Sequence, residues 1–276
     1  MGVAVQSHHF SVGAMVAWAR AGVGAVATQS MVEMSYGPLG LELMSFKIPA
    51  DQALKGLLAA DRAAQWRQVA MIDARGNVSV HTGSKCTPFA GSASGEQFSC
   101  QGNLLVRRDI VEEMRTTFSK SVGLTLAERL VKSLLSGEEA GGDLRGKQSA
   151  AILVVGGEYS TNPYSGRLID LRVEDHPDPI VELERLLHQK RAVDRSHKGM
   201  AAATSGDYEV ASKEYKKANE IYPLAEFRFW RAVYLSNAGK QSEANKIFKS
   251  VFEEDKRWVL VAQRLHKVGR LAKLPP

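Results

Sequence analysis

Two short segments of this sequence carry residue types that could hold the oxygen atoms of a small ligand. In the first, residues 81–86 read His-Thr-Gly-Ser-Lys-Cys, and Lys85 would supply positive charge to a carboxylate or an oxyanion. In the second, Gln101 and Asn103 flank Gly102, so two amide side chains would offer donors where glycine lets a ligand approach the backbone. The alternative for both segments is a structural or solvent-exposed role.

The sequence gives less support to a nucleophilic residue or a metal site. Lys85 could lower the pKa of the neighbouring Cys86 thiol, but the sequence places no His or Asp partner beside it. Cys86 and Cys100 stand 14 positions apart without CxxC spacing, which favours two free thiols over a zinc site or a disulfide. His8 and His9 would point to opposite faces of a strand and cannot jointly bind a metal. We therefore expect no metal and no cofactor.

A glycine-rich loop, Gly141-Gly-Asp-Leu-Arg-Gly146, superficially resembles an anion-binding loop. No Lys-Ser/Thr signature opens a helix after it, so it lacks the pattern of a phosphate-binding P-loop. A tight structural loop with a local pair between Asp143 and Arg145 is the favoured interpretation.

The composition is that of an ordinary globular protein. The 276 residues suffice for one large domain or for a medium and a small one, and 44% hydrophobic with 24% charged residues argue against disorder. No apolar run approaches the roughly 18 to 20 residues needed to span a bilayer, and the first residues lack the pattern of a signal peptide. We therefore expect a cytoplasmic protein with no membrane partner.

The net charge of +6 is distributed unevenly. Residues 188–276 hold 18 Lys and Arg against 10 Asp and Glu. These cations are spread around helical faces without an interleaved aromatic platform, so a solvated surface is favoured and no nucleic-acid partner is expected.

The first part of the chain alternates apolar, strand-like runs with paired helical stretches. Strands are predicted at residues 3–5, 23–27, 68–72, 78–81 and 150–155. The turn-forming sequence Asp73-Ala-Arg-Gly-Asn77 predicts a hairpin, so the sheet is at least partly antiparallel. Helices are predicted at 37–45, 49–60, 109–117 and 124–136, the last with Gly137 as its C-cap. Helix pairs between groups of strands indicate a layered α/β sandwich.

The last part of the chain is predicted to be wholly helical. After the rigid connector Asp175-His-Pro-Asp-Pro179, helices are predicted near 180–190, 195–205, 207–220, 225–238, 240–253 and 257–267. A repeat supports this: residues 206, 211, 215 and 218 (Gly, Ala, Tyr, Ala) recur 33 positions later as Gly, Ala, Phe and Val. The offset is one residue short of the tetratricopeptide (TPR) period, and the small and aromatic positions suit packed antiparallel helices. We expect an α/β domain at 1–190 and a TPR-like helical domain at 191–276.

Motifs across the first 190 residues resemble those of a known bacterial family. They are Gly2-Val-Ala-Val-Gln-Ser7 and the segments 18–29, 36–43, 81–86, 101–103, 141–149 and 175–179, all in family order. The family they resemble is called domain of unknown function one-zero-two-eight (DUF1028) and is placed with the N-terminal nucleophile (Ntn) hydrolases. The resemblance implies an α+β fold, a four-layer αββα sandwich, and hydrolysis of an amide bond in an unknown substrate. In such enzymes an N-terminal Thr, Ser or Cys attacks the amide carbonyl while its own α-amine acts as base.

The same resemblance suggests where a site would lie. Family members carry the nucleophile on an extra strand before Gly-Val-Ala-Val, whereas this sequence begins at the second strand, with Met1 in place of the linking turn. We therefore expect little or no amidase activity from the chain as given. We expect one cleft lined by Ser7, Thr28, Gln29, Lys85, Gly102 and Asn103, with Gln6 at its edge; polar strand ends facing solvent are the alternative.

Three functions stay open on the sequence alone. The chain could be an Ntn-type amide hydrolase, a non-catalytic protein that binds a small amide or peptide-like ligand in the cleft, or a structural subunit of a homo-oligomer. A TPR-like tail could also bind a protein partner. Two repeats are few for a free solenoid, so we expect the tail to pack on the sandwich or on its own final helix, near residues 258–268.

Overall fold

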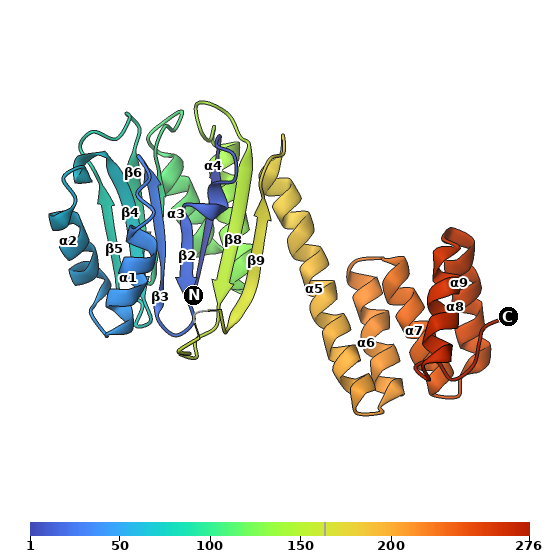
Figure 1. The fold of residues 1–276 in the computed structure, drawn as a ribbon. Helices are drawn as coiled ribbons and strands as arrows, with labels where there is room; N and C mark the ends of the chain where they lie inside the picture. Colours follow the sequence, from blue (N-terminus) through green and yellow to red (C-terminus); the bar gives the residue numbers. More distant parts are fainter. Residues whose placement is uncertain (163) are drawn as a thin grey trace. The chain divides into compact units, whose positions relative to one another are not determined.

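The structure of the chain is a computed structural model that describes residues 1–162 and 164–276. The chain is divided into two compact units, an N-terminal unit, Met1–Arg185, and a helical unit, Leu186–Pro276 (Figure 1). The N-terminal unit mixes helices and strands, and the C-terminal region is helical, so the α+β class and the helical tail are confirmed.

Antiparallel sheets form the centre of the N-terminal unit. A four-stranded sheet has the order β2 (Ala17–Arg20), β3 (Gly24–Ser30), β4 (Arg67–Asp73), β5 (Val78–Thr82). A three-stranded sheet has the order β1 (Gly2–Ser7), β8 (Ser149–Val155), β9 (Arg167–Val173), and β6 (Gly91–Gly95) pairs with β7 (Phe98–Gly102). Every strand pair among the described residues is antiparallel, so the chain has no doubly wound parallel sheet there.

The predicted hairpin joins β4 to β5. Gly76 takes a positive φ of 86°, which glycine adopts without a steric penalty. The Asp73 carboxylate accepts hydrogen bonds from the backbone N–H groups of Arg75 (2.8 Å) and Asn77 (3.1 Å). The local sequence therefore fixes this turn, as expected.

Four strands were not predicted: β2, β6, β7 and β9. Strand β6 reads Gly-Ser-Ala-Ser-Gly and offers none of the β-branched or aromatic residues that mark a strand. It is a strand because β7 pairs with it.

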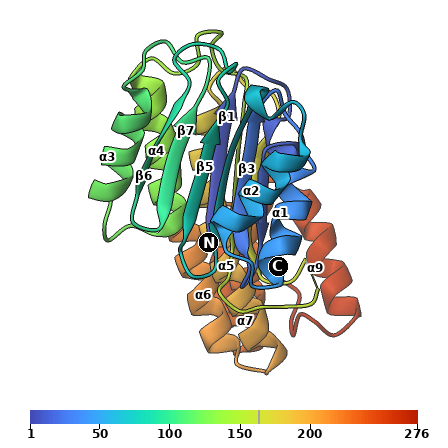
Figure 2. The same ribbon diagram turned by 90° about the vertical axis from the view of Figure 1, so that its left-hand side faces the viewer.

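Two pairs of helices cover the sheets from opposite sides (Figure 2). Helices α1 (Tyr36–Ser45) and α2 (Ala50–Ala60) pack on the β2–β5 sheet, where Leu54 and Met71 are buried together. Helices α3 (Ile110–Lys120) and α4 (Leu126–Glu139) pack on β1, β8 and the β6–β7 pair. Short 3₁₀ turns occur at Val12–Ala14 and Ala64–Trp66.

Gly137 is not the C-cap that the sequence predicted. It lies inside α4, two residues before the last one, Glu139, and a Cβ there would come within 2.9 Å of the Met114 side chain of α3. Its role is close helix packing. The left-handed residues that follow α4 are Gly141 and Gly142, with φ of 122° and 59°.

Between the two sheets the core is built from small side chains. Val3 and Val5 of β1 pack with Ala19 of β2, Ala25 of β3 and Ala151 of β8, all buried. Small residues on facing strands let the two sheets approach closely.

The helical unit begins at Leu186, in the first third of α5, and includes all the helices that follow. Its helices are α5 (Pro179–Thr204), α6 (Tyr208–Ile221), α7 (Ala225–Asn237), α8 (Gln241–Glu254) and α9 (Arg257–Lys267). The predicted break near residues 190–195 is absent, because no Gly or Pro interrupts α5 there. None of the described helices is long and apolar enough to cross a bilayer.

The repeated positions take the same conformation and burial in both copies. Gly206 and Gly239 have φ of 81° and 80° at helix ends, where the following N–H bonds back to the last turn. Tyr215 and Phe248 are both buried. The centre of the unit is aromatic: the ring of Phe229 lies 5.6 Å from that of Phe248 and 4.6 Å from that of Trp258, on α9.

Candidate functional site

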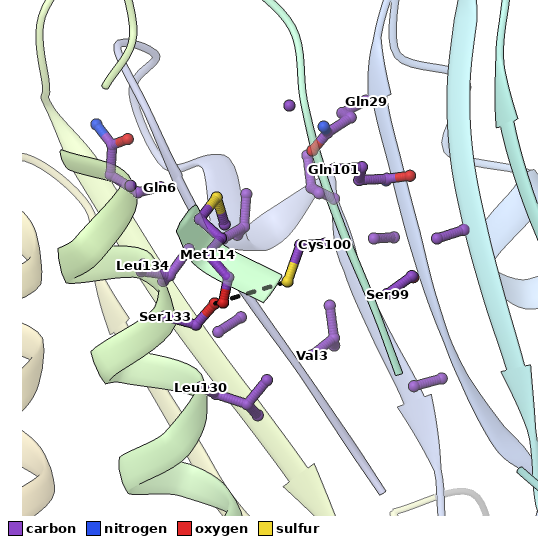
Figure 3. Close-up of a pocket in the computed structure, with 18 of the residues that line it drawn as sticks. Val3, Gln6, Gln29, Ser99, Cys100, Gln101, Met114, Leu130, Ser133 and Leu134 are labelled. Carbon is purple, nitrogen blue, oxygen red and sulfur yellow. Dashed lines mark hydrogen bonds between the residues drawn. The ribbon is translucent and has the colours of Figure 1, made fainter. Parts of the chain in front are cut away.

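The N-terminal unit contains a cavity of about 880 Å³, which is within the size range of small-molecule sites. Strands β1 and β7, helices α3 and α4, and the inner sides of β3 and β4 supply its walls (Figure 3). One end is polar, with Ser7, Gln29, Lys85, Asn103 and Arg145. Apolar residues such as Val3, Val5, Leu130 and Leu134 line the middle of the cavity, and Arg75 and Glu96 are also part of its lining.

An amide network stands at the polar end. The Oε1 atom of Gln68, on β4, accepts hydrogen bonds from Gln29 Nε2 at 2.7 Å and from Asn103 Nδ2 at 3.1 Å. The Gln68 Nε2 atom donates to Thr82 Oγ1 at 2.9 Å and to the carbonyl of Gly102 at 2.9 Å. A single buried amide thus ties two strands to the loop after β7.

Gln68 is a site residue that sequence reasoning missed. It is fully buried, although glutamine is usually exposed. Gln68 lies on the same face of β4 as Ala70 and Ile72, which line the cavity. Val69 and Met71 lie on the opposite face, which packs against α1 and α2. The signal was available: an amide at the start of an otherwise apolar strand requires buried partners.

Ser7 lies beside the glycine-rich loop. Arg145 Nη2 is 3.4 Å from Ser7 Oγ, and the same guanidinium donates to the Asp143 carboxylate at 2.7 and 3.0 Å. The hydrogen bonds to Asp143 raise the pKa of Arg145 above its ordinary value, so this cation is held in its charged form. The predicted local pair of Asp143 and Arg145 is present, and its contact with Ser7 was not foreseen because 138 positions separate the two residues.

Lys85 and Gly102 complete the polar end. The Lys85 ammonium lies 5.1 Å from the centre of the Trp66 ring, a cation–π distance that leaves its charge at the mouth of the cavity. Gly102 is buried, and a Cβ at this position would come within 2.8 Å of the Leu105 side chain. A larger residue here would force the Leu105 side chain to shift, and the Gly102 carbonyl accepts a hydrogen bond from Gln68.

Thr28 does not line the cavity. It is buried, and its hydroxyl donates to the carbonyl of Glu33 at 3.0 Å. Neighbouring residues of a strand point to opposite faces, so Gln29 faces the cavity while Thr28 faces α1. The structure thus brings five of the six candidate residues to one cavity; their function stays a prediction.

The two cysteines are free thiols. Cys86 donates to the carbonyl of Arg67 at 3.4 Å, outside the cavity wall. Cys100 does line the cavity, 3.7 Å from Ser133 Oγ, and burial raises the pKa of its thiol to about 11. A thiol that stays protonated at neutral pH is a poor nucleophile, so the chemistry of the cavity does not centre on Cys100.

Two further side chains of the wall are incompletely bonded. Gln6 Nε2 and both polar atoms of the Gln101 amide are buried without a hydrogen-bond partner among the described residues. Figure 3 shows these residues on opposite sides of the cavity, at corresponding heights on β1 and β7. Such groups are a ready source of hydrogen bonds for a ligand.

Chemically, this arrangement suits the binding of acceptor oxygens. Arg145 and Lys85 provide cations, while Asn103 and Gln29 provide amides held in place by Gln68. The polar partner of Ser7 Oγ among the described residues is the Arg145 guanidinium, which cannot serve as a general base because it stays protonated.

Comparison with known proteins gives one family. The family of unknown function DUF1028 matches residues 1–183 of the chain. Among solved structures, the chain is similar to protein SPO2555 from Silicibacter pomeroyi, a DUF1028 protein, with 27% identity and a TM-score of 0.61. That similarity covers 68% of this chain and 79% of the other. No curated protein matches the chain.

Proposed function

The chain belongs to the family of unknown function DUF1028, and from that premise we propose that its N-terminal unit is an Ntn-hydrolase-type sandwich whose cavity binds an amide or peptide-like ligand. Two helix pairs outside stacked antiparallel sheets support the sandwich. The cavity between the strands supports ligand binding.

One observation carries the binding proposal: the side-chain amides of Gln29 and Asn103, both bonded to Gln68, line one end of the cavity. Side-chain amides offer both donors and acceptors, which is what the N–H and C=O groups of an amide ligand require. Arg145, 3.4 Å from Ser7, adds a charge for the ligand's carbonyl or carboxylate oxygen.

Hydrolysis of the bound amide is the second candidate function. It is favoured by the positions of Arg145 and Lys85, two cations at the end where an oxyanion would need stabilisation. Binding without turnover is favoured by the Ser7 hydroxyl, whose bonded neighbour is a guanidinium and not a base.

For the helical unit we propose a TPR-like role in binding a protein partner, with domain limits of 1–190 and 191–276. The matching φ values of Gly206 and Gly239 and the matched burial of Tyr215 and Phe248 support a repeat of this type.

The binding proposal is tested on the full chain with N-acetylglycinamide and N-acetylglycine, by calorimetric titration. We expect both to bind, the second more tightly because of its carboxylate. Asn103→Leu should weaken both at least tenfold, whereas Arg145→Gln should remove the preference for N-acetylglycine. Arg62→Gln, an exposed arginine outside the cavity, is the matched control.

The result that overturns the proposal is binding that Asn103→Leu leaves unchanged, or no binding of either compound at millimolar concentration. Hydrolysis is followed in the same samples by release of glycine from N-acetylglycine. Turnover that Ser7→Ala abolishes would establish the second candidate function, and binding without turnover would exclude it for these compounds.

A further inference from the structure

The chain that leaves β3 forms part of the polar end of the cavity. Gln29 and Ser30 are the last two residues of β3, and Met31 and Val32 follow them; all four line the cavity. Residues 30–33, the rim loop, then lead toward α1. The position of the rim loop therefore sets where the side chains of Gln29 and Met31 stand in the cavity wall.

The rim loop begins with an unusual backbone conformation. Ser30 has a φ of 70°, in the left-handed region where glycine is the usual residue. A residue with a side chain stays in this conformation only where the surrounding structure imposes it. The contacts that impose it come from residues outside the cavity lining, on the side of the loop away from the cavity.

Arg67, which precedes Gln68 on β4, holds the first part of the rim loop. Its Nη1 atom donates to the Met31 carbonyl at 2.6 Å, and the Met31 N–H donates to the Trp66 carbonyl at 3.2 Å. Both backbone polar groups of Met31 are thus bonded to the start of β4 and to the residue before it. The loop cannot move there without breaking these two hydrogen bonds.

Asp61, directly after α2, fixes the Arg67 guanidinium. Its carboxylate accepts hydrogen bonds from Arg67 Nε at 2.8 Å, from the Tyr36 hydroxyl at 3.1 Å and from the Ala63 N–H at 2.8 Å. The hydrogen bond from Arg67 lowers the pKa of Asp61, and the same bond raises the pKa of Arg67. Both side chains are therefore charged at neutral pH, and they are only 14% and 17% exposed.

Thr28 holds the last part of the rim loop. It is fully buried, and its hydroxyl donates to the Glu33 carbonyl at 3.0 Å. Arg67 therefore bonds to the second residue of the loop and Thr28 to the fourth. A buried hydroxyl and a largely buried guanidinium, each bonded to one backbone carbonyl, leave the loop little freedom.

We propose that Arg67, Asp61 and Thr28 are positioning residues for a ligand at the polar end of the cavity. They hold the rim loop, and the loop in turn fixes the side-chain amide of Gln29, which bonds to Gln68 at 2.7 Å. None of these three positioning residues lines the cavity. The proposal rests on the ligand site proposed above, to which it adds residues that do not touch the ligand.

Arg67→Lys is the principal variant, because lysine keeps the positive charge but has one donor atom in place of the planar fork that bonds two partners. Arg20→Lys is the matched control. Arg20 is 17% exposed, pairs with Glu42 at 3.8 Å and donates to the Ser160 carbonyl at 3.5 Å. It too joins a carboxylate to a backbone carbonyl, but it does not line the cavity or contact the rim loop.

The first measurement needs no ligand. The side-chain amide resonances of Gln29 are followed by NMR of the full, ¹⁵N-labelled chain, and Arg67→Lys should shift them. Hydrogen exchange of the Met31 amide should become about tenfold faster or more, because its loop is released. The Asp73 amide, which bonds across the β4–β5 turn at 3.1 Å, should keep its rate. Arg20→Lys should change none of these signals.

The second measurement is the affinity for N-acetylglycinamide, by calorimetric titration. Arg67→Lys should weaken binding by about fivefold or more, and so should Thr28→Val, which removes the hydroxyl and keeps the shape of the side chain. Arg20→Lys should leave the affinity unchanged. Urea unfolding of each variant checks that the protein is folded under the titration conditions, so that a lost affinity is not a lost fold.

Unshifted Gln29 resonances in Arg67→Lys and Thr28→Val overturn the proposal. Unchanged affinity in variants whose Gln29 resonances do shift overturns it as well. If N-acetylglycinamide does not bind the wild type, the proposed ligand site fails, and the Gln29 resonances alone decide whether Arg67 and Thr28 position that amide. If Arg67→Lys does not fold, Thr28→Val decides both measurements.

Discussion

The interiors of the two units of this chain are packed differently. The helical unit fills its centre with aromatic rings, with Phe229 stacked on Trp258 and in contact with Phe248. The N-terminal unit leaves about 880 Å³ between its strands and helices, and polar atoms of Gln6 and Gln101 in the wall have no hydrogen-bond partner in the part of the chain that the structure describes. A dense aromatic core serves stability, whereas unfilled space with unpaired polar groups has a cost and is therefore the better place to look for function.

The largest expected loss of stability comes from a substitution in the filled interior of the helical unit. Phe229→Ala should cost about 3–5 kcal/mol, because it removes a fully buried ring and leaves a void. Leu134→Ala, on the cavity wall, should cost only about 1–2 kcal/mol, because much of its side chain already faces open space. Hydrogen exchange of α7 and α4 amides would measure each effect in its own unit. Equal losses would contradict the contrast between the two interiors.

The second effect concerns the amide network. Gln68→Leu should cost about 2–4 kcal/mol, because the carbonyls of Gly91 and Gly102 and the amides of Gln29 and Asn103 all lose their partner. Gln52→Leu on the exposed face of α2 is the control and should stay within about 0.5 kcal/mol of the wild type. Urea unfolding would compare them. A silent Gln68→Leu would mean that the network does not stabilise the fold.

The third effect is a pH dependence of the free energy of unfolding, caused by Cys100 in the cavity wall. Burial raises the pKa of Cys100 from 9.0 to about 11, so the unfolded chain ionises this thiol first. Stability from the neutral thiol is complete below pH 9 and is lost as the pH rises from 9 to 11, by about 2–3 kcal/mol. Cys100→Ala should lack this part of the loss. Unfolding free energies of both proteins across pH 8 to about 11 would then converge, and parallel curves would argue against the buried thiol.

The smallest effect tests the repeat. Gly239 has a φ of 80°, so Gly239→Ala should cost about 1–2 kcal/mol. Gly56, in the exposed interior of α2 with no atom within 4 Å of its Cβ position, is the matched glycine, and Gly56→Ala should stabilise by about 0.5–1 kcal/mol. Thermal unfolding would show shifts of opposite sign. A neutral Gly239→Ala would remove the conformational argument for the repeat.

Local features of the fold were readable from the sequence. The β4–β5 turn follows from Asp73 and Gly76, and the helices follow from apolar periodicity within a few residues of their observed ends. The 33-residue repeat located α6 and α8 because glycine and alanine act at short range, in a turn and in a helix contact. Strand β6 was missed because its residues have no strand preference, and Gly137 was misread because its packing partner, Met114, lies on another helix.

The sequence by itself determined which residues share a strand, a helix face or a turn, since those relations depend on neighbours a few positions away. It therefore indicated the polar strand ends and the local Asp143–Arg145 pair, but it placed Thr28 beside Gln29 at the same site. Only the tertiary structure decided that Gln68 joins Gln29 to Asn103, that Arg145 reaches Ser7, and that β1 and β7 line one cavity. These hydrogen bonds join residues 35 to 138 positions apart, and their existence depends on how whole sheets and helices pack, which no local pattern specifies.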